Sequence, residues 1–282
     1  MPNHLIIQGK EIATPVLKQL ARLAAAETIQ ALGPHAFRLV HANSLSRDDI
    51  AAHCAETGLD YGFIPADRHI DDFKLVAMDM DSTLIAIECI DEVADMIGLK
   101  SEVAAITQTA MRGEIGFAES LSRRVALLAG LDASALQRVY DERLQLSPGA
   151  DKLIRTLQQH GIKTLLVSGG FTFFTERLQK RLNLDYSAAN TLEIVNGKLT
   201  GQVLGDILDA QAKADHLIRL STQLGLKASE LVAIGDGAND IPMLAKAAVS
   251  IAYHAKPIVR AQAAYALNFN DLDAVLPLLG LT

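Results

Sequence analysis

Residues 73–83 read FKLVAMDMDST, an apolar run that passes directly into acidic and hydroxyl side chains. A continuous apolar run of this kind is typical of a strand that is buried on both faces of a parallel sheet. Similar short runs follow at residues 163–167, 231–234 and 248–252. Because the segments between them have apolar positions at helical spacing, we expect an α/β core, a doubly wound parallel sheet with helices on both faces.

The first three of these strands end in side chains that can carry chemistry. The first delivers Asp79 and Asp81, the second Ser168 and Gly169, and the third Asp236 and Asp240. In such sheets the ligand lies outside the carboxyl ends of the strands, so we expect these side chains to converge. Several carboxylates at one edge repel one another unless a cation lies among them, and oxygen ligands favour Mg²⁺. Glycine N–H groups after the second strand can approach an anion closely.

Lys213, in the helical stretch AQAKA at 210–214, offers a positive charge for a phosphoryl oxygen. Considered without the other residues, Lys213 would be interpreted as a solvated lysine on a helix. The Asp79–Asp81 pair would likewise be interpreted as a solvated turn. Two other phosphate-binding motifs are excluded. The stretch GDGAND at 235–240 ends in aspartate where the dinucleotide fingerprint needs glycine, and the chain contains no GxxxxGK[ST].

Composition excludes several classes of protein. The chain has 26 Lys and Arg against 33 Asp and Glu, and this net charge of −7 argues against non-specific nucleic-acid binding. The longest stretch without an ionic residue, 164–175, is too short for a membrane span, and no signal peptide is expected. The only cysteines, Cys54 and Cys89, form no disulfide framework, which favours a reducing cytoplasm.

The first seventy residues form a separate unit in this prediction. Strands and helices alternate there, with strands expected at 4–7, 36–41 and 61–64 and helices at 14–32 and 46–57. The polar stretch at 65–72 is a plausible boundary. We therefore expect a small N-terminal α+β domain over residues 1–70 and a core over 71–282. Within the core, the pattern from 89 to about 143 is helical throughout.

The order and spacing of these residues resemble the haloacid dehalogenase-like (HAD) phosphatases, whose core is Rossmann-like. The family motifs DxDx[TS], a strand-end serine or threonine, a lysine and GDxxxD correspond here to Asp79, Asp81 and Thr83, to Ser168, to Lys213, and to Asp236 and Asp240. The resemblance implies that Asp79 attacks phosphorus and becomes an aspartyl phosphate. Asp81 would protonate the leaving oxygen and then deprotonate the hydrolytic water.

The same resemblance implies a metal site and a phosphoryl site. Mg²⁺ would be bound by the side chains of Asp79 and Asp236 and by the backbone carbonyl of Asp81. Asp240 would support the metal site or hold Lys213. The transferring oxygens would be bound by Ser168, Gly169 and Lys213.

The helical insertion at about 88–146 stands where the HAD family places a cap, and its sequence resembles the phosphoserine phosphatase family. The similar stretches are ECIDE at 88–92, MRGEIGFAESLSRRV at 111–125 and LSPG at 146–149. The resemblance implies that Glu88 receives the substrate ammonium and Arg124 the carboxylate, with the neighbouring Arg123 as the alternative. Met111 and Phe117 would pack against the substrate. Asn239 would reach the phosphate or the amino-acid part.

The function implied is Mg²⁺-dependent hydrolysis of O-phospho-L-serine, the last step of serine biosynthesis, by a cytoplasmic monomer or homodimer without nucleic-acid or membrane partners. Two alternatives stay open at this point. The enzyme could pass its phosphoryl group to another alcohol, or act on another phosphomonoester such as phosphohomoserine. The N-terminal segment, which is similar to small amino-acid-binding (ACT-like) regulatory domains, could make the chain a ligand sensor, or serve only in packing or dimerisation.

Overall fold

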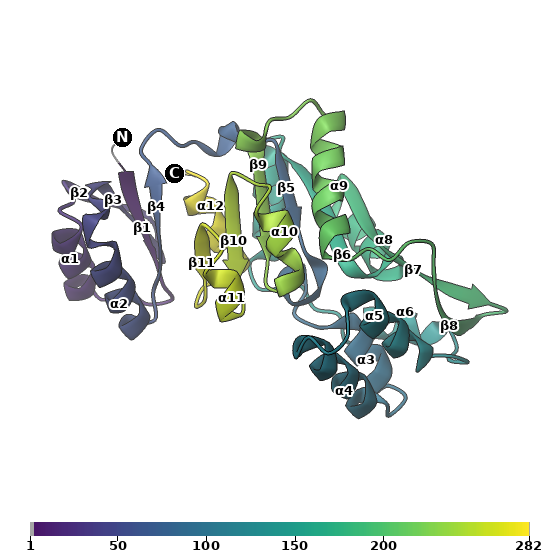
Figure 1. Cartoon of the computed structure of the whole chain (residues 1–282). Coiled ribbons are helices and arrows are strands. Elements are labelled where there is room, and N and C mark those ends of the chain that lie inside the picture. The colour runs from purple at the N-terminus through teal and green to yellow at the C-terminus, as the bar shows by residue number, and fades with distance from the viewer. Residues whose placement is uncertain (1–2, 282) are drawn as a thin grey trace.

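The computed structural model describes residues 3–281 and confirms the α/β architecture (Figure 1). The larger sheet has the order β11-β10-β9-β5-β6-β7-β8. Its strands are β5 (Leu75–Met78), β6 (Lys163–Phe171), β7 (Tyr186–Val195), β8 (Lys198–Leu204), β9 (Leu231–Gly235), β10 (Val249–Tyr253) and β11 (Tyr265–Leu267). The described pairs are parallel except β7 with β8. The predicted strand β5 therefore lies in the centre of the sheet.

Helices cover both faces of this sheet. They are α7 (Ala150–Gln159), α8 (Thr172–Leu182), α9 (Ala210–Gln223), α10 (Ile241–Leu244), α11 (Pro257–Arg260) and α12 (Val275–Leu278). Side chains of β5 alternate between the two faces, so that Val76 and Met78 enter one apolar cluster while Leu75 and Ala77 enter the other. This two-sided burial explains why the strand is apolar at every position. None of the helices within residues 3–281 has the length and apolar character needed to cross a bilayer.

Four helices follow β5 and form one body at an end of the core, which we call the helical insertion (Figure 1). They are α3 (Cys89–Asp95), α4 (Lys100–Met111), α5 (Phe117–Ala126) and α6 (Ser134–Glu142). The chain enters and leaves the insertion side by side, because Ile85 pairs with Leu146 in an antiparallel bridge. The β7–β8 hairpin reaches over from the core, and the carbonyl of Leu199 accepts a hydrogen bond from the Gly130 N–H at 2.8 Å. The insertion is thus tied to the core at two places.

The N-terminal unit is a four-stranded antiparallel sheet with the order β2-β3-β1-β4. Its elements are β1 (Asn3–Gln8), α1 (Thr14–Leu23), β2 (Thr28–Gly33), β3 (Ala36–Ala42), α2 (Arg47–Thr57) and β4 (Asp60–Pro65). The predicted helix over 14–32 is wrong beyond Leu23. The backbone turns at Ala25, where φ is +45°, and the following residues form an edge strand paired with β3. Cross-strand pairing overrides the local helical pattern there.

Strand β4 fastens the N-terminal unit to the core. The buried Asp60 carboxylate accepts hydrogen bonds from three consecutive core N–H groups, those of residues 268–270, at 2.7–3.1 Å. The Tyr265 hydroxyl donates to the Phe63 carbonyl at 2.9 Å. A Cβ at Gly62 would lie 2.5 Å from Leu278 Cδ2, so this close approach needs glycine. The two units are joined by specific polar contacts as well as by packing.

Candidate active site

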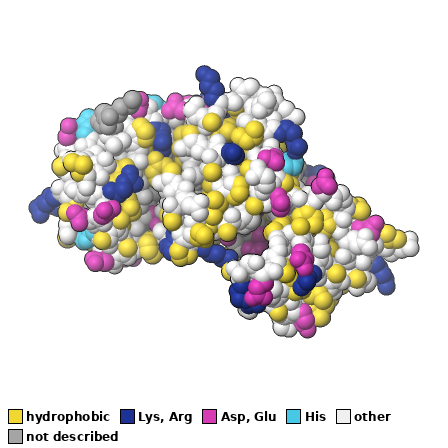
Figure 2. Space-filling model, in the orientation of Figure 1, with side chains coloured by type: hydrophobic (Ala, Val, Ile, Leu, Met, Phe, Trp, Pro, Cys, Tyr) yellow, Lys and Arg dark blue, Asp and Glu magenta, His cyan; other side chains and the backbone are white. Residues whose placement is uncertain are grey.

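A cavity of about 560 Å³ opens between the carboxyl ends of the central strands and the helical insertion. The core contributes residues at the carboxyl end of β6 and residues that follow β5, β9 and β10, and the insertion contributes residues of α3, α4 and α5. Figure 2 shows the hollow between these two parts of the molecule, with acidic side chains inside it. Most residues singled out from the sequence line this cavity: Asp79, Asp81, Glu88, Met111, Phe117, Arg124, Ser168, Gly169, Asp236 and Asn239.

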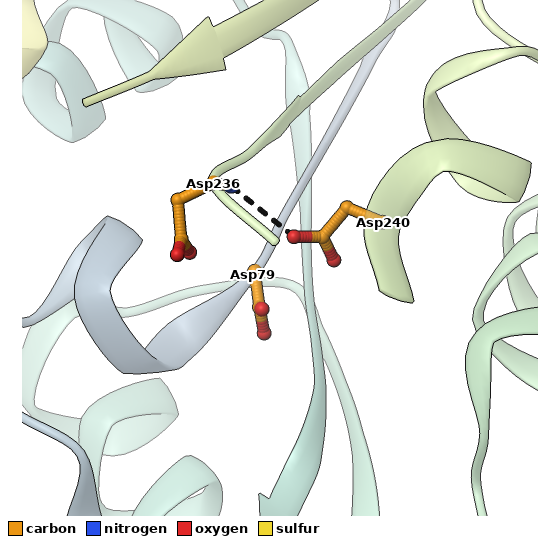
Figure 3. Close-up of side chains that lie close together, drawn as sticks. All are labelled: Asp79, Asp236 and Asp240. Carbon is orange, nitrogen blue, oxygen red and sulfur yellow. Dashed lines mark hydrogen bonds between the residues drawn. The ribbon is translucent and has the colours of Figure 1, made fainter. Parts of the chain in front are cut away.

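Three carboxylates lie close together, as Figure 3 shows, and two of them, Asp79 and Asp236, line the cavity. Asp79 follows β5, Asp236 follows β9, and Asp240 stands at the start of α10. One oxygen of each lies within 4.8 Å of the others. Asp236 is held in place by Thr83, whose hydroxyl donates to Oδ1 at 2.9 Å. The side chain of Asp81 lies outside this group of three among the residues described.

Lys213 of α9 is buried behind the carboxylates and binds two of them. Its Nζ lies 2.8 Å from Asp79 Oδ2 and 2.8 Å from Asp240 Oδ1. The other oxygen of Asp240 accepts hydrogen bonds from the N–H groups of Asp236 and Gly237, at 3.2 and 3.0 Å. Burial alone lowers the pKa of Lys213, but the two carboxylates outweigh it and raise that pKa, so the lysine stays charged. Asp240 therefore contacts Lys213 and also belongs to the acidic group.

One lysine does not balance this acidic group. Burial, followed by the charge of Asp240, raises the pKa of Asp79 well above its usual range despite the contact with Lys213. Burial and Asp240 likewise raise the pKa of Asp236 to about 7. Carboxylates that resist ionisation in this way are stabilised by an added cation. The donors are oxygens and lie close together, which suits a hard divalent ion such as Mg²⁺.

Asp81 points to a different wall of the cavity. Its Oδ1 accepts a hydrogen bond from the Cys89 N–H at 3.0 Å, and a Cβ at Gly170 would lie 2.8 Å from its Oδ2. Desolvation, followed by the charge of Glu88, raises the pKa of Asp81 to about 7. A carboxyl group with such a pKa can both give and accept a proton near neutral pH.

The end of β6 supplies hydroxyl and backbone groups beside the carboxylates. The Ser168 hydroxyl accepts a hydrogen bond from the Gly170 N–H at 2.9 Å, and the Gly169 carbonyl accepts one from Asn190 Nδ2 at 2.8 Å. A Cβ at Gly169 would lie 2.8 Å from the ring of Phe117, which reaches in from α5. The core and the helical insertion therefore touch at this point.

Two groups of opposite charge lie on the side of the cavity formed by the insertion. Glu88 Oε1 accepts a hydrogen bond from the Ser82 hydroxyl at 2.7 Å. Although part of Glu88 is exposed in the cavity, surrounding protein atoms desolvate its carboxylate and raise its pKa. Arg124 lines the cavity, whereas Arg123 is exposed elsewhere and pairs with Glu119 at 2.6 Å. Of the two neighbouring arginines, only Arg124 has access to a ligand in this cavity.

The mouth of the cavity holds the remaining candidates. Asn239 lies on the core side, and Met111 lies on the insertion side with 62% of its surface exposed. Two charged lining residues were missed by the sequence reasoning, Asp91 of α3 and Lys256 after β10. Lys256 follows the fourth predicted strand, so the rule of inspecting strand ends could have found it. Nothing comparable in the sequence pointed to Asp91.

Comparison with known proteins adds family information to this geometry. The haloacid dehalogenase-like hydrolase family matches residues 73–248, and a domain family of unknown function matches residues 5–50. A phosphoserine phosphatase from Polaromonas sp. is 50% identical over 226 residues, which cover 78% of this chain and 96% of that protein.

Solved structures are similar over nearly the whole chain. A HAD family hydrolase from Salmonella enterica serovar Typhi has a TM-score of 0.90 and 31% identity, with 98% of each chain covered. A probable phosphoserine phosphatase from Vibrio cholerae has a TM-score of 0.86 and 38% identity, covering 99% of this chain and 86% of that one. These likenesses include the N-terminal unit as well as the core.

Proposed function

This chain belongs to the haloacid dehalogenase-like hydrolase family, and we propose that it is a Mg²⁺-dependent phosphatase that hydrolyses O-phospho-L-serine to serine and phosphate. One observation carries the choice of substrate. A single cavity combines the acidic group and the strand ends on one side with Glu88 and Arg124 on the other. Phosphoserine has a phosphate, an ammonium and a carboxylate, and this cavity offers a complementary group for each.

We propose that Asp79 is the nucleophile. Its carboxylate lines the cavity and is oriented by Lys213 and by the N–H of Met80, which donates to Oδ1 at 2.7 Å. Attack of a carboxylate oxygen on phosphorus forms an aspartyl phosphate, while the bond from phosphorus to the serine oxygen breaks. Ser168, the N–H of Gly169 and Lys213 would bind the phosphoryl oxygens, where negative charge spreads during transfer.

Asp81 would move the protons. It gives one to the departing serine oxygen, and it later takes one from the water that attacks the aspartyl phosphate, which restores Asp79. Its pKa of about 7 supports both roles at neutral pH. Because Asp81 comes two residues after Asp79 and lines the same cavity, it can serve both half-reactions from one place.

Mg²⁺ would be held by Asp79, Asp236 and the backbone carbonyl of Asp81, with Asp240 supporting the site through Lys213. When bound, the ion offsets carboxylate repulsion and withdraws charge from the phosphoryl oxygens. In this proposal Glu88 binds the ammonium of the substrate and Arg124 its carboxylate, while Met111, Phe117 and Asn239 border the bound molecule. Both cysteines are free thiols, which supports the cytoplasm as the compartment. We expect a monomer or a homodimer.

The experiment that tests this function measures phosphate release from phosphoserine against phosphohomoserine, phosphoethanolamine and an aryl phosphate, with and without Mg²⁺. The proposal expects the highest kcat/KM for phosphoserine. A second arm adds a large excess of another alcohol, such as homoserine, and looks for a phosphorylated product. Preference for a different ester, or transfer in place of hydrolysis, would contradict the proposal.

A further inference from the structure

Lys256 stands at the mouth of the cavity and spans its two sides. It follows β10 and directly precedes α11, and its N–H donates to the Asp236 carbonyl at 3.4 Å. The exposed side chain lines the cavity and reaches across the mouth, where Nζ lies 3.9 Å from the sulfur of Met111. The backbone of Lys256 is thus anchored beside a candidate metal ligand, while its ammonium group faces the helical insertion.

The charges that line the cavity are unbalanced. The carboxylates number five, namely Asp79, Asp81, Glu88, Asp91 and Asp236, against the two cations Arg124 and Lys256. A phosphomonoester dianion approaching such a cavity is repelled by its walls, since each unit charge acts over several ångströms in a partly desolvated site. With one divalent ion in place and Asp81 carrying the proton that it gives to the leaving oxygen, the formal charges of the lining cancel, and the lining offers a dianion no net attraction. Productive entry therefore depends on the few cations near the mouth.

The ammonium group of Lys256 forms no ion pair with any residue that the structure describes. Within residues 3–281, the lysine ion pairs are those of Lys100, Lys152, Lys163 and Lys213. The polar contact of Lys256 Nζ is with a thioether sulfur, which is a weak acceptor. Its positive charge is therefore free to act on an incoming anion.

We infer that Lys256 recruits the anionic substrate: its charge at the mouth attracts the phosphomonoester into the acidic cavity and takes no part in bond breaking. This inference rests on the cavity being the phosphomonoester site of the proposed function. The role inferred for Lys256 differs from the roles proposed for Glu88 and Arg124. Attraction by charge depends on the net charge of the substrate and not on its amino-acid part. Phosphoserine and p-nitrophenyl phosphate both carry about two negative charges at neutral pH, and phosphoethanolamine carries about one.

The test compares Lys256→Met, which keeps most of the length of the side chain and removes the charge, with Lys256→Arg, which keeps the charge. Lys246→Met is the control, since Lys246 is exposed and does not line the cavity. At low salt, Lys256→Met should lower kcat/KM about tenfold for both dianions and by less for phosphoethanolamine, with kcat changed at most about twofold. The deficit should shrink as the salt concentration approaches about 0.5 M, because screening removes attraction at this range.

Lys256→Arg and Lys246→Met should both behave as the parent protein. An unchanged kcat/KM in Lys256→Met, an equal loss in Lys256→Arg, a loss confined to phosphoserine, or a fall in kcat as large as the fall in kcat/KM would each overturn the inference. Failure of the proposed function is recognised separately. If the parent hydrolyses p-nitrophenyl phosphate but not phosphoserine, the substrate assignment fails, while the role of Lys256 is decided on the aryl ester. If the parent hydrolyses none of the three esters, both fail.

Discussion

Two regions of the molecule contain buried carboxylates and stabilise the negative charge in different ways. One is the N-terminal unit, with Asp60, and the other is the edge of the core sheet. Asp60 accepts four N–H donors, three from the backbone and one from Asn270 Nδ2. At the core edge, one lysine binds Asp79 and Asp240 but not Asp236, and the pKa values of Asp79 and Asp236 are raised. A carboxylate with enough donors holds two parts of a protein together. A group of carboxylates with too few donors favours the arrival of a cation.

Sheet topology accounts for the difference. The parallel strands β5, β6 and β9 all end at one edge, so side chains from distant parts of the sequence converge there. The antiparallel N-terminal sheet sends alternate strands in opposite directions and gathers no such edge. Substitutions at the core edge should therefore change catalysis, and substitution of Asp60 should change stability.

The largest effect is expected for Asp79→Asn. The substitution keeps the shape of the side chain and removes the nucleophile, so turnover of phosphoserine should fall about 10⁴-fold or more, on the scale seen when a nucleophile is removed. Steady-state kinetics measures the loss, and circular dichroism with thermal unfolding checks that the protein stays folded. Substantial turnover in a folded Asp79→Asn protein would remove Asp79 from its proposed role.

The second-largest effect is expected when divalent ions are removed. Excess EDTA is expected to lower kcat about 10³-fold or more, because the acidic group then lacks the cation that offsets its repulsion. Added Mg²⁺ should restore activity. Ca²⁺ should not, since it takes longer bonds and more ligands and would disturb attack by Asp79. Turnover that persists undiminished in the chelator would contradict this assignment.

A more moderate effect is expected when the side chains proposed to bind the amino-acid part of phosphoserine are replaced. Loss of a buried charge-assisted contact costs about 2–5 kcal/mol, so Glu88→Gln and Arg124→Ala should lower kcat/KM for phosphoserine roughly 30-fold to several thousand-fold. An aryl phosphate offers neither partner, and its kcat/KM should change by a few-fold at most.

Arg123→Ala is the matched control, because that side chain is exposed and pairs with Glu119 outside the cavity. Equal losses on both substrates in the Glu88 and Arg124 variants would mean that these residues hold the helical insertion in place. A selective loss in Arg123→Ala would mean that the neighbouring arginine binds the substrate.

The smallest effect on catalysis is expected for Asp60→Asn. This change should leave kcat nearly unchanged and lower the free energy of unfolding by about 2–4 kcal/mol, because buried N–H donors lose their charged acceptor. Urea and thermal unfolding measure the loss, with Asp67→Asn, at an exposed position, as the control. A variant as stable as the parent would show that the contacts of Asp60 do not join the two units.

The core was predictable because its signals are local. Strands β5, β6, β9 and β10 appear as apolar runs, and the chemistry follows from the residues directly after them. Strand β11 was missed because its three residues pair with the core only at long range, with Tyr265 also bonded to Phe63 of the N-terminal unit. Distances, burial and pKa values at the site also depend on long-range packing, which no local pattern contains.

The N-terminal unit was harder to predict because it depends on pairing. Strand β2 is exposed over most of its length, so it lacks the alternation that marks a half-buried strand, and α1 was extended through it. At the site, separating Arg124 from Arg123 needed the orientation of α5 against the core. Lys256 was predictable from the sequence, because it follows β10 at the same edge of the sheet as the ends of β5, β6 and β9.

The most direct test of the central claim is to trap the phosphoenzyme. Protein mixed with phosphoserine labelled in the phosphoryl group is quenched in acid within milliseconds, digested, and mapped by mass spectrometry. The account predicts label on Asp79 that is stable in acid and released by hydroxylamine, as expected for an acyl phosphate, and no label in Asp79→Asn. Label on Ser168, or label that persists in Asp79→Asn, would contradict it.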